Sequence, residues 1–135
     1  MAVTTYDVRD VNVIVNGRVI TGFSDGSSIE AEKNQDNFTP HVGVKGEVTF
    51  AESNDETGTV TITVKSTSPS YPYLTSLANR RGESAIVPIQ IVDLNTNSVQ
   101  VGGNEARVMQ PASAEWGNEE SDREFSIYVA DYKVR

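Results

Sequence analysis

Few residues in this sequence have the type and spacing that catalysis requires. His41 is the only histidine among the 135 residues, and a general base or metal ligand needs partners that its neighbours in the sequence do not supply. The one Gly-x-Ser-x-Gly match, Gly22-Phe23-Ser24-Asp25-Gly26, is followed by the strand-like segment 29–33 and not by a helix, so it lacks the strand-to-helix turn of a nucleophile elbow. We therefore expect a surface or interface role for His41, no catalytic residues and no enzymatic activity.

The acidic clusters do not have the spacing of a metal site. Glu52, Asp55 and Glu56 lie close together, but they lack the Asp-x-Asp-x-Asp-Gly pattern with a distal glutamate that binds calcium. Further acidic positions are typical of turns or exposed edges: Asp25-Gly26, Glu119-Glu120 and Asp122. The absence of cysteine excludes disulfides and thiolate zinc sites. We predict no metal and no cofactor.

The glycine pairs and the single tryptophan have structural explanations. Gly102-Gly103 and Gly43-x-x-Gly46 lack the strand-to-helix spacing of a phosphate loop or dinucleotide site, so they predict bulges or bends. Trp116 has the ring that stacks on sugars, but a lone tryptophan is more often a core or interface anchor. Sugar binding through Trp116 stays open as an alternative.

Charge and composition narrow the classes of partner. The net charge is -8, and this argues against nucleic-acid binding, because phosphate contacts are made by clustered Lys and Arg. Repulsion of a passing polyanion is consistent with that charge. No stretch approaches the roughly 20 apolar residues that span a bilayer, and we expect no membrane partner. The length fits one domain of residues 1–135 with a single core.

Alternating apolar residues predict a mainly β chain. Asn16-Gly17 is a strong hairpin signal between its flanking strands, and residues 57–65 alternate most regularly, with Val60, Ile62 and Val64 on one side and threonines on the other. A polar turn is expected at Asn95-Thr96-Asn97 and a loop at 115–122. The predicted strands are 11–15, 18–22, 29–33 (half-buried, with its charges on one face), 38–44, 46–52, 57–65, 84–93, 98–110 and 123–134.

One segment changes to a helical period. Tyr71, Leu74 and Leu77 recur at three and four residues after serines that can cap a helix, so we predict a short helix over about 70–81 with these side chains inward. Gly82 is its expected terminator. The strands do not alternate with helices, and the sequence has no internal repeat, so we predict an antiparallel β-barrel or sandwich. We also expect an extended N-terminal arm and a long loop over about 34–56.

Several short sequence segments, taken in order along the chain, resemble the tail tube proteins of contractile-tailed phages. They are Tyr6-Asp7, Val15-Asn16-Gly17-Arg18-Val19-Ile20-Thr21-Gly22-Phe23-Ser24-Asp25-Gly26, Asp36-Asn37-Phe38-Thr39-Pro40-His41-Val42-Gly43, Gly46-Glu47-Val48, and the stretch from Gly58 to Ser70 that leads into the helix. The resemblance covers residues 6 to about 93 and is weaker through 104–122. This family is similar to the tube protein of type VI secretion.

The resemblance implies a structural virion protein whose hexameric rings stack into the tail tube, the channel for genome delivery. Implied partners are the chain itself, the tail sheath protein, tape-measure and baseplate or terminator proteins, and double-stranded DNA that passes without specific binding. The implied location is the virion tail, after assembly in the host cytoplasm. The N-terminal segment and the region 34–55 would contact the next ring, and the outer surface would meet the sheath. The candidates for the inter-ring contact are Asn34, Asp36, Phe38, His41, Glu52 and Asp55, and those for the channel lining are Thr59, Thr61, Thr63 and Lys65.

Two alternative functions remain. The first is the tube of a type VI or other contractile injection system, which shares the architecture but passes proteins instead of DNA. The second is a monomeric β-sandwich module that binds a carbohydrate or host surface through Trp116 and the tyrosines. The tube predicts rings or filaments, whereas the binding module predicts a monomer with a ligand.

Overall fold

The protein is mainly β, with one α-helix in the part of the chain that the structure describes. A computed structural model describes residues 3–24, 26, 28–96 and 98–135. The main sheet is antiparallel, with strand order β2-β1-β7-β8-β9-β6-β3 and β10 paired to β8, and a separate hairpin consists of β4 and β5. The elements are η1 (Val8–Asp10), β1 (Val11–Val15), β2 (Arg18–Val19), β3 (Ile29–Lys33), β4 (Phe38–Val42), β5 (Val48–Glu52), β6 (Gly58–Lys65), α1 (Ser70–Ala78), η2 (Gly82–Ala85), β7 (Val87–Asp93), β8 (Val101–Val108), β9 (Asp122–Val129) and β10 (Lys133–Val134).

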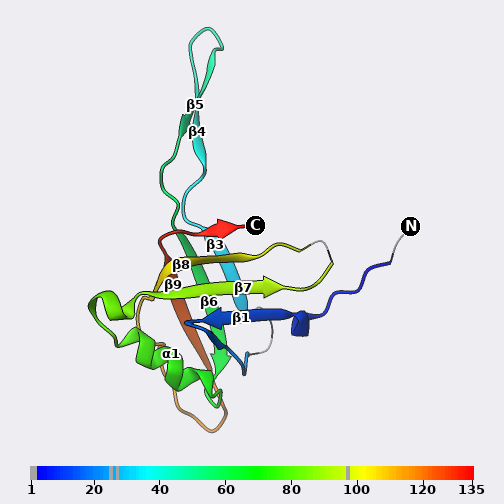
Figure 1. Cartoon of the computed structure of the whole chain (residues 1–135), viewed down its shortest axis with the longest axis vertical. Helices are drawn as coiled ribbons and strands as arrows, with labels where there is room; N and C mark the ends of the chain where they lie inside the picture. Colours follow the sequence, from blue (N-terminus) through cyan, green and yellow to red (C-terminus); the bar gives the residue numbers. More distant parts are fainter. Residues whose placement is uncertain (1–2, 25, 27, 97) are drawn as a thin grey trace.

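The main sheet folds over itself into two layers around one core. In Figure 1, β1, β7 and β8 cross β9, β6 and β3 at a steep angle, and α1 covers one open side. Alternate residues of each long strand point between the layers, as the period of two in the sequence predicts. Val60, Ile62 and Val64 of β6 are fully buried there, which confirms the predicted inward face of this strand.

Two local signals at the start of the chain are confirmed. Asn16 and Gly17 both have positive φ, at 52° and 79°, as the two-residue turn between β1 and β2 requires. The chain then crosses to the other layer, where Phe23 bridges to Val64 and the Lys65 amide donates to the Gly22 carbonyl at 2.8 Å. This crossing joins the two layers at one end, and the fold is therefore intermediate between a sandwich and a barrel.

Helix α1 packs as expected but ends early. Leu74 and Leu77 are fully buried and Tyr71 packs against the core, while the Ser70 amide donates to the Ser68 hydroxyl at 3.1 Å. The predicted end at residue 81 is wrong. The Arg80 amide bonds three residues back to Leu77, and Arg81 is extended, so Gly82 begins the short helix η2 instead of terminating α1.

The strands of the last third are shorter than the sequence suggests. Strand β7 begins at Val87, not at residue 84, because η2 occupies the preceding residues. The predicted strand over 123–134 is split into β9 and β10, since the chain turns at Asp131. A register shift of β8 against β7 follows Gly103, which confirms the predicted bulge. Two predicted turn positions, Asp25 and Asn97, lie outside the described residues.

Strands β4 and β5 project far beyond the main sheet (Figure 1). We call these strands and their connecting turn, residues 38–52, the arm. The two strands fall within the predicted ranges 38–44 and 46–52, and the turn contains Gly43 and Gly46. Gly46 has a φ of 91° and its amide donates to the Gly43 carbonyl at 3.0 Å, which confirms a bend at this pair.

Candidate assembly surfaces

The outer side of β3, β6 and β9 forms one polar face. Residues directly opposite each other on paired strands share a side of the sheet. Thr59, Thr61, Thr63 and Lys65 of β6 therefore lie on this side together, between two further sets of polar residues. The register adds Glu30 and Glu32 of β3, Asp122, Glu124, Ser126 and Tyr128 of β9, and Arg107 of β8. We call this surface the polar face.

The polar face carries an excess of carboxylates. Its four acidic side chains come from the two strands that flank β6, and its cations are Lys65 and Arg107. The threonines and Lys65 were predicted from the sequence to line a channel, whereas none of these acids was predicted to join them. Alternation within 29–33 and 122–129 does place the acids on one side of each strand, but only the strand pairing puts both sides on the same surface.

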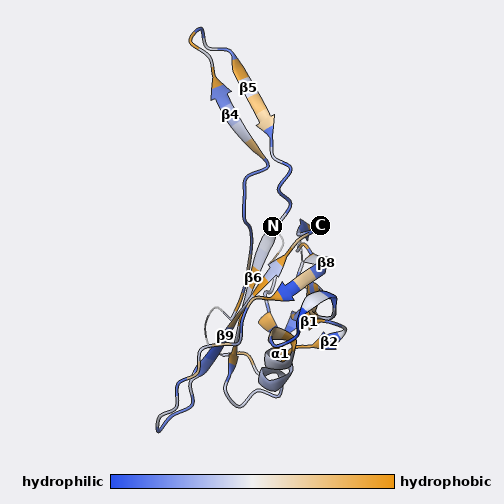
Figure 2. Cartoon of the chain, turned by 90° about the vertical axis from the view of Figure 1, so that its left-hand side faces the viewer, coloured by the Kyte–Doolittle hydropathy of each residue, from blue (hydrophilic) through white to orange (hydrophobic). Residues whose placement is uncertain are grey.

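The arm has one mainly apolar side and one polar side, and the residues of both strands are exposed. Phe38 and Pro40 of β4 lie on the same side as Phe50 of β5, with Val42 opposite Val48. The rings of Phe38 and Phe50 meet edge to face at 4.9 Å between centroids. Phe50 is nevertheless 62% exposed. Figure 2 shows this concentration of hydrophobic residues on the arm, away from the core.

The other side of the arm is small and polar. His41 lies there opposite Thr49, with Thr39 opposite Ala51, and all four are exposed. The structure thus gives His41 the surface position expected from the sequence. Among the described residues, no group of three or more His, Asp or Glu side chains is placed to hold a metal ion.

Hydrogen bonds fix the root of the arm to the polar face. The Asn34 amide donates from Nδ2 to the Thr57 hydroxyl at 2.9 Å and accepts from the Thr59 hydroxyl at 2.8 Å. Asp55 accepts from the hydroxyl and the amide of Thr57 at 2.6 and 2.9 Å. These bonds, that of the hydroxyl first, lower the pKa of Asp55. The predicted inter-ring residue Asn34 therefore contacts the predicted channel residue Thr59.

The predicted inter-ring residues divide into two groups. Phe38, His41 and Glu52 belong to the arm itself. Asn34, Asp36 and Asp55 belong to the two connections between the arm and the main sheet. The bonds of Asn34 and Asp55 give these two side chains a role in orienting the arm.

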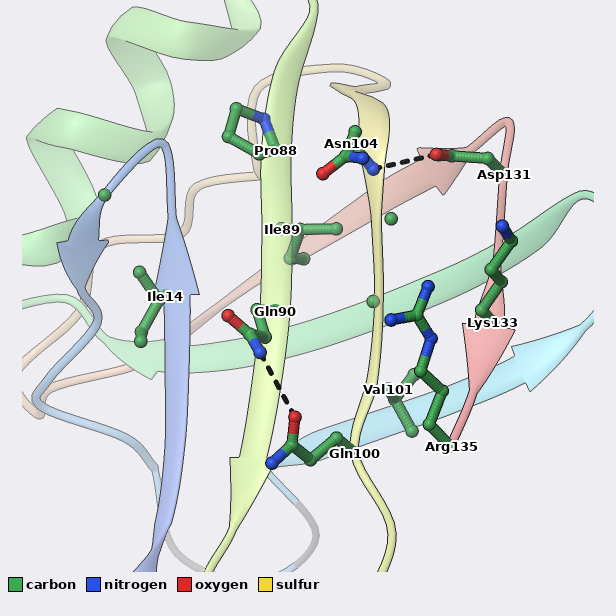
Figure 3. Close-up of a pocket in the computed structure, with 13 residues that line it drawn as sticks. Ile14, Pro88, Ile89, Gln90, Gln100, Val101, Asn104, Asp131, Lys133 and Arg135 are labelled. Carbon is green, nitrogen blue, oxygen red and sulfur yellow. Dashed lines mark hydrogen bonds between the residues drawn. The ribbon is translucent and has the colours of Figure 1, made fainter.

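A shallow hollow lies on the opposite layer, over β1, β7, β8 and β10. Figure 3 shows Gln90, Gln100, Lys133 and Arg135 around it, with Gln90 donating to Gln100 at 3.3 Å. Gly102 and Gly103 of β8 are among the residues that line the hollow. Its one carboxylate, Asp131, accepts the amides of Asn104 and Glu105, each at 3.0 Å.

Asp131 stabilises the β8 bulge. Partial burial of its carboxyl raises the pKa, but the hydrogen bonds from the backbone amides of Asn104 and Glu105 outweigh that effect, so the pKa is lowered overall. The bulge amides would otherwise have no strand partner. Sequence reasoning missed this residue because its partners lie 26 and 27 positions away.

No helix in the described part of the chain is long and apolar enough to cross a membrane. The sequence matches no protein-family model, and no curated protein matches it either.

Three solved structures of contractile injection systems share the fold. A chain from the sheath/tube terminator of the extracellular system PVC in its extended state superposes with a TM-score of 0.64 at 11% identity, over 100% of this chain and 99% of that chain. A chain from the tube terminating cap of the anti-feeding prophage gives 0.59 at 12% identity, over 100% and 94%. A chain from the extended PVC sheath-tube complex gives 0.57 at 12%, over 97% and 91%. At these identities the similarity establishes a common fold.

Proposed function

We propose that this protein is the tube subunit of a contractile phage tail, in which six copies form a ring and stacked rings enclose the channel for the genome. The polar face lines the channel, and the arm binds neighbouring copies. The protein acts as a structural component of the virion tail and not as an enzyme. The sheath surrounds the tube, a tape-measure protein sets its length, and baseplate and terminator proteins bound its ends.

The observation that carries this proposal is the uncovered apolar side of the arm. A two-stranded hairpin is marginally stable by itself in water, and exposed apolar patches of this kind mark interaction sites. The arm projects away from the core (Figure 1), and Phe50 stays mostly exposed although its ring meets that of Phe38. Contact with another copy would bury both sides of the hairpin and remove its open edges.

The charge of the polar face supports a channel for DNA. Carboxylates on β3 and β9 outnumber the cations Lys65 and Arg107. A duplex carries one negative charge per about 1.7 Å of its axis, so a wall with this charge repels it and prevents tight binding. Thr59, Thr61 and Thr63 add a smooth surface of short side chains. DNA would therefore pass without being held.

The fold similarity to contractile injection systems agrees with this assignment. Two of those chains belong to structures described as a tube terminator and a terminating cap, and these descriptions favour a second candidate, a terminator that closes the end of a tube. A tube subunit forms long open tubes, whereas a terminator forms a single ring. A tube of a type VI or other injection system would share the geometry and differ in its cargo.

Substitution of the exposed ring of the arm tests the proposal. Phe50→Ser removes the more exposed of the two aromatic rings on the apolar side and leaves the core untouched, and Thr49→Ser is a matched control on the polar side of the same strand. Sedimentation velocity and electron microscopy at high concentration would measure assembly. We expect rings and tubes from the parent and the control, and monomers with unchanged thermal unfolding from Phe50→Ser. Tubes of normal length from Phe50→Ser would contradict the role of the arm. A parent that stays monomeric and binds a glycan through Trp116 would favour the binding module.

A further inference from the structure

The loop between β8 and β9, residues 109–121, lies at the opposite end of the molecule from the arm. Strand β6 connects the two ends: its first residue, Gly58, pairs with Lys33 at the root of the arm, and its last, Lys65, pairs with Asp122 directly after the loop. Figure 1 shows the arm at the top and this loop at the bottom, and Figure 2 shows the same separation from the side. We call residues 109–121 the acidic loop, because they include Glu115, Glu119 and Glu120 and no Lys or Arg.

A buried arginine holds the acidic loop in place. Arg123 is 1% exposed and donates to the Glu115 carbonyl at 3.1 Å, to the Ser121 hydroxyl and to the Asp122 carbonyl. The Ser121 hydroxyl in turn donates to the Glu115 carbonyl at 2.7 Å. These bonds join the start and the end of residues 115–121, so the segment has a fixed shape.

The same arginine positions Trp116. Its guanidinium lies 5.4 Å from the centre of the Tyr71 ring and 5.6 Å from that of Trp116, distances at which a cation is attracted to an aromatic face. Among the described residues, Arg123 Nε has no hydrogen-bond partner. Trp116 is nevertheless 83% exposed. A large aromatic ring is thus held on the surface, outside the core cluster.

The tip of the arm complements this loop in chemistry and charge. Val44 is fully exposed at the turn and Lys45 is the cation beside it. The carboxylate of Glu47 folds back, with Oε2 2.6 Å from the position that a Cβ on Gly43 would take. An apolar tip with a leading cation therefore faces away from one end of the molecule, while a fixed tryptophan among three glutamates faces away from the other.

We propose that the acidic loop is the docking site for the arm of a second copy of this chain, in the adjacent ring. Surfaces at opposite ends of one molecule make a head-to-tail contact, and such contacts propagate into open stacks when the rotation between copies does not close a ring. Trp116 is the anchor and packs against the apolar side of the incoming arm, and Lys45 meets the glutamates. This inference rests on the proposed function and names the surface that the arm binds.

The single tryptophan makes the contact directly measurable. Trp116 is the only tryptophan in the chain, so intrinsic fluorescence reports on this site alone. Assembly of the parent should move its emission maximum to shorter wavelength as the ring leaves water. Trp116→Ala should raise the concentration needed for assembly at least about tenfold, as expected for an interface anchor, while its high exposure leaves the monomer folded. Tubes whose tryptophan stays solvent-exposed would overturn the docking site and leave the proposed function standing.

Thiol cross-linking locates the contact independently of tube formation. The chain has no cysteine, so Val44→Cys and Gly117→Cys can be made in separate copies and mixed with a short bis-maleimide. Gly117 has open space around a Cβ, and Glu83→Cys, an exposed position on η2, is the matched control. We expect heterodimers from the Val44 and Gly117 pair and none from the Val44 and Glu83 pair. Tubes without the first cross-link would overturn the docking site, whereas no assembly and no cross-link at any concentration would overturn the proposed function with it.

Discussion

Gly58 lies where the arm joins the main sheet, and a methyl group there should disrupt the core. A Cβ added to Gly58 would stand 2.2 Å from Cγ of Tyr132, and its three nearest atoms all belong to that side chain. Tyr132 is buried in the core cluster. Its backbone is held in place by a hydrogen bond that the Tyr132 amide donates to the Glu56 carbonyl at 2.9 Å. The ring therefore has to move when Gly58 is replaced by alanine.

The structure sets the size of this effect. If the ring stays inside under strain, overpacking costs about 1–3 kcal/mol, and if it is expelled the loss approaches the 3–5 kcal/mol typical of truncating a large aromatic residue. We expect Gly58→Ala to lower the free energy of unfolding by about 3 kcal/mol. With a urea slope of about 2 kcal/mol per M, the midpoint should fall by about 1.5 M.

A double-mutant cycle separates the clash from other causes. In a Tyr132→Ala background the atoms that clash are gone, and alanine at position 58 should then stabilise by about 0.5–1 kcal/mol, because glycine in a strand loses more backbone entropy on folding. Urea unfolding followed by circular dichroism measures all four proteins. An equal cost of Gly58→Ala in both backgrounds would refute the reasoning, since the effect would not depend on the ring.

Two further predictions concern the main sheet. Gly22→Ala should lower the free energy of unfolding in urea by about 2 kcal/mol, because Gly22 has a φ of 73° and an added Cβ would meet the Ser68 Oγ at 2.5 Å. Gly26→Ala is the control, since Gly26 also has a positive φ but has open space around a Cβ. An equal loss of stability in the control would exclude the Ser68 contact as the cause. Asp131→Asn should lower stability at neutral pH, because the pKa of Asp131 is lowered in the folded protein and its charged form therefore stabilises the fold above the ordinary pKa of 3.8. This contribution is lost as pH falls through the lowered pKa, so the stability difference between parent and variant should disappear at lower pH. A difference that stays constant with pH would show that the charge of Asp131 has no role.

Local patterns in the sequence were sufficient for most of the strands. The alternation over 57–65 and the Asn16-Gly17 turn depend on neighbouring residues, and the structure confirms both. The predicted end of α1 was wrong. Glycine is a common helix terminator, which is why the sequence points to Gly82, but the helix ends at Asn79, whose amide donates hydrogen bonds to the Thr75 and Leu77 carbonyls. The periodicity of the helical segment does not indicate where the following element, η2, begins.

The candidate surfaces depended on pairing between distant strands. Thr59, Thr61 and Thr63 were assigned from alternation in one strand, but Glu30 and Glu124 join them only through the registers of β3 and β9 against β6. The arm presents a related problem. Its alternation was visible, but the same pattern is also typical of a strand covered by a second layer. Only the tertiary structure shows that Phe50 is mostly exposed.

A cryo-electron microscopy reconstruction of the assembled protein tests the central proposal most directly. We expect a hollow tube of stacked rings in which Thr59, Thr61, Thr63 and Lys65 face the channel together with Glu30 and Glu124, and in which each arm reaches an adjacent ring. An assembly with the polar face buried or on its outer surface would contradict the proposed channel. A protein that remains monomeric at all concentrations, even when mixed with preformed tail components, would contradict tube formation itself.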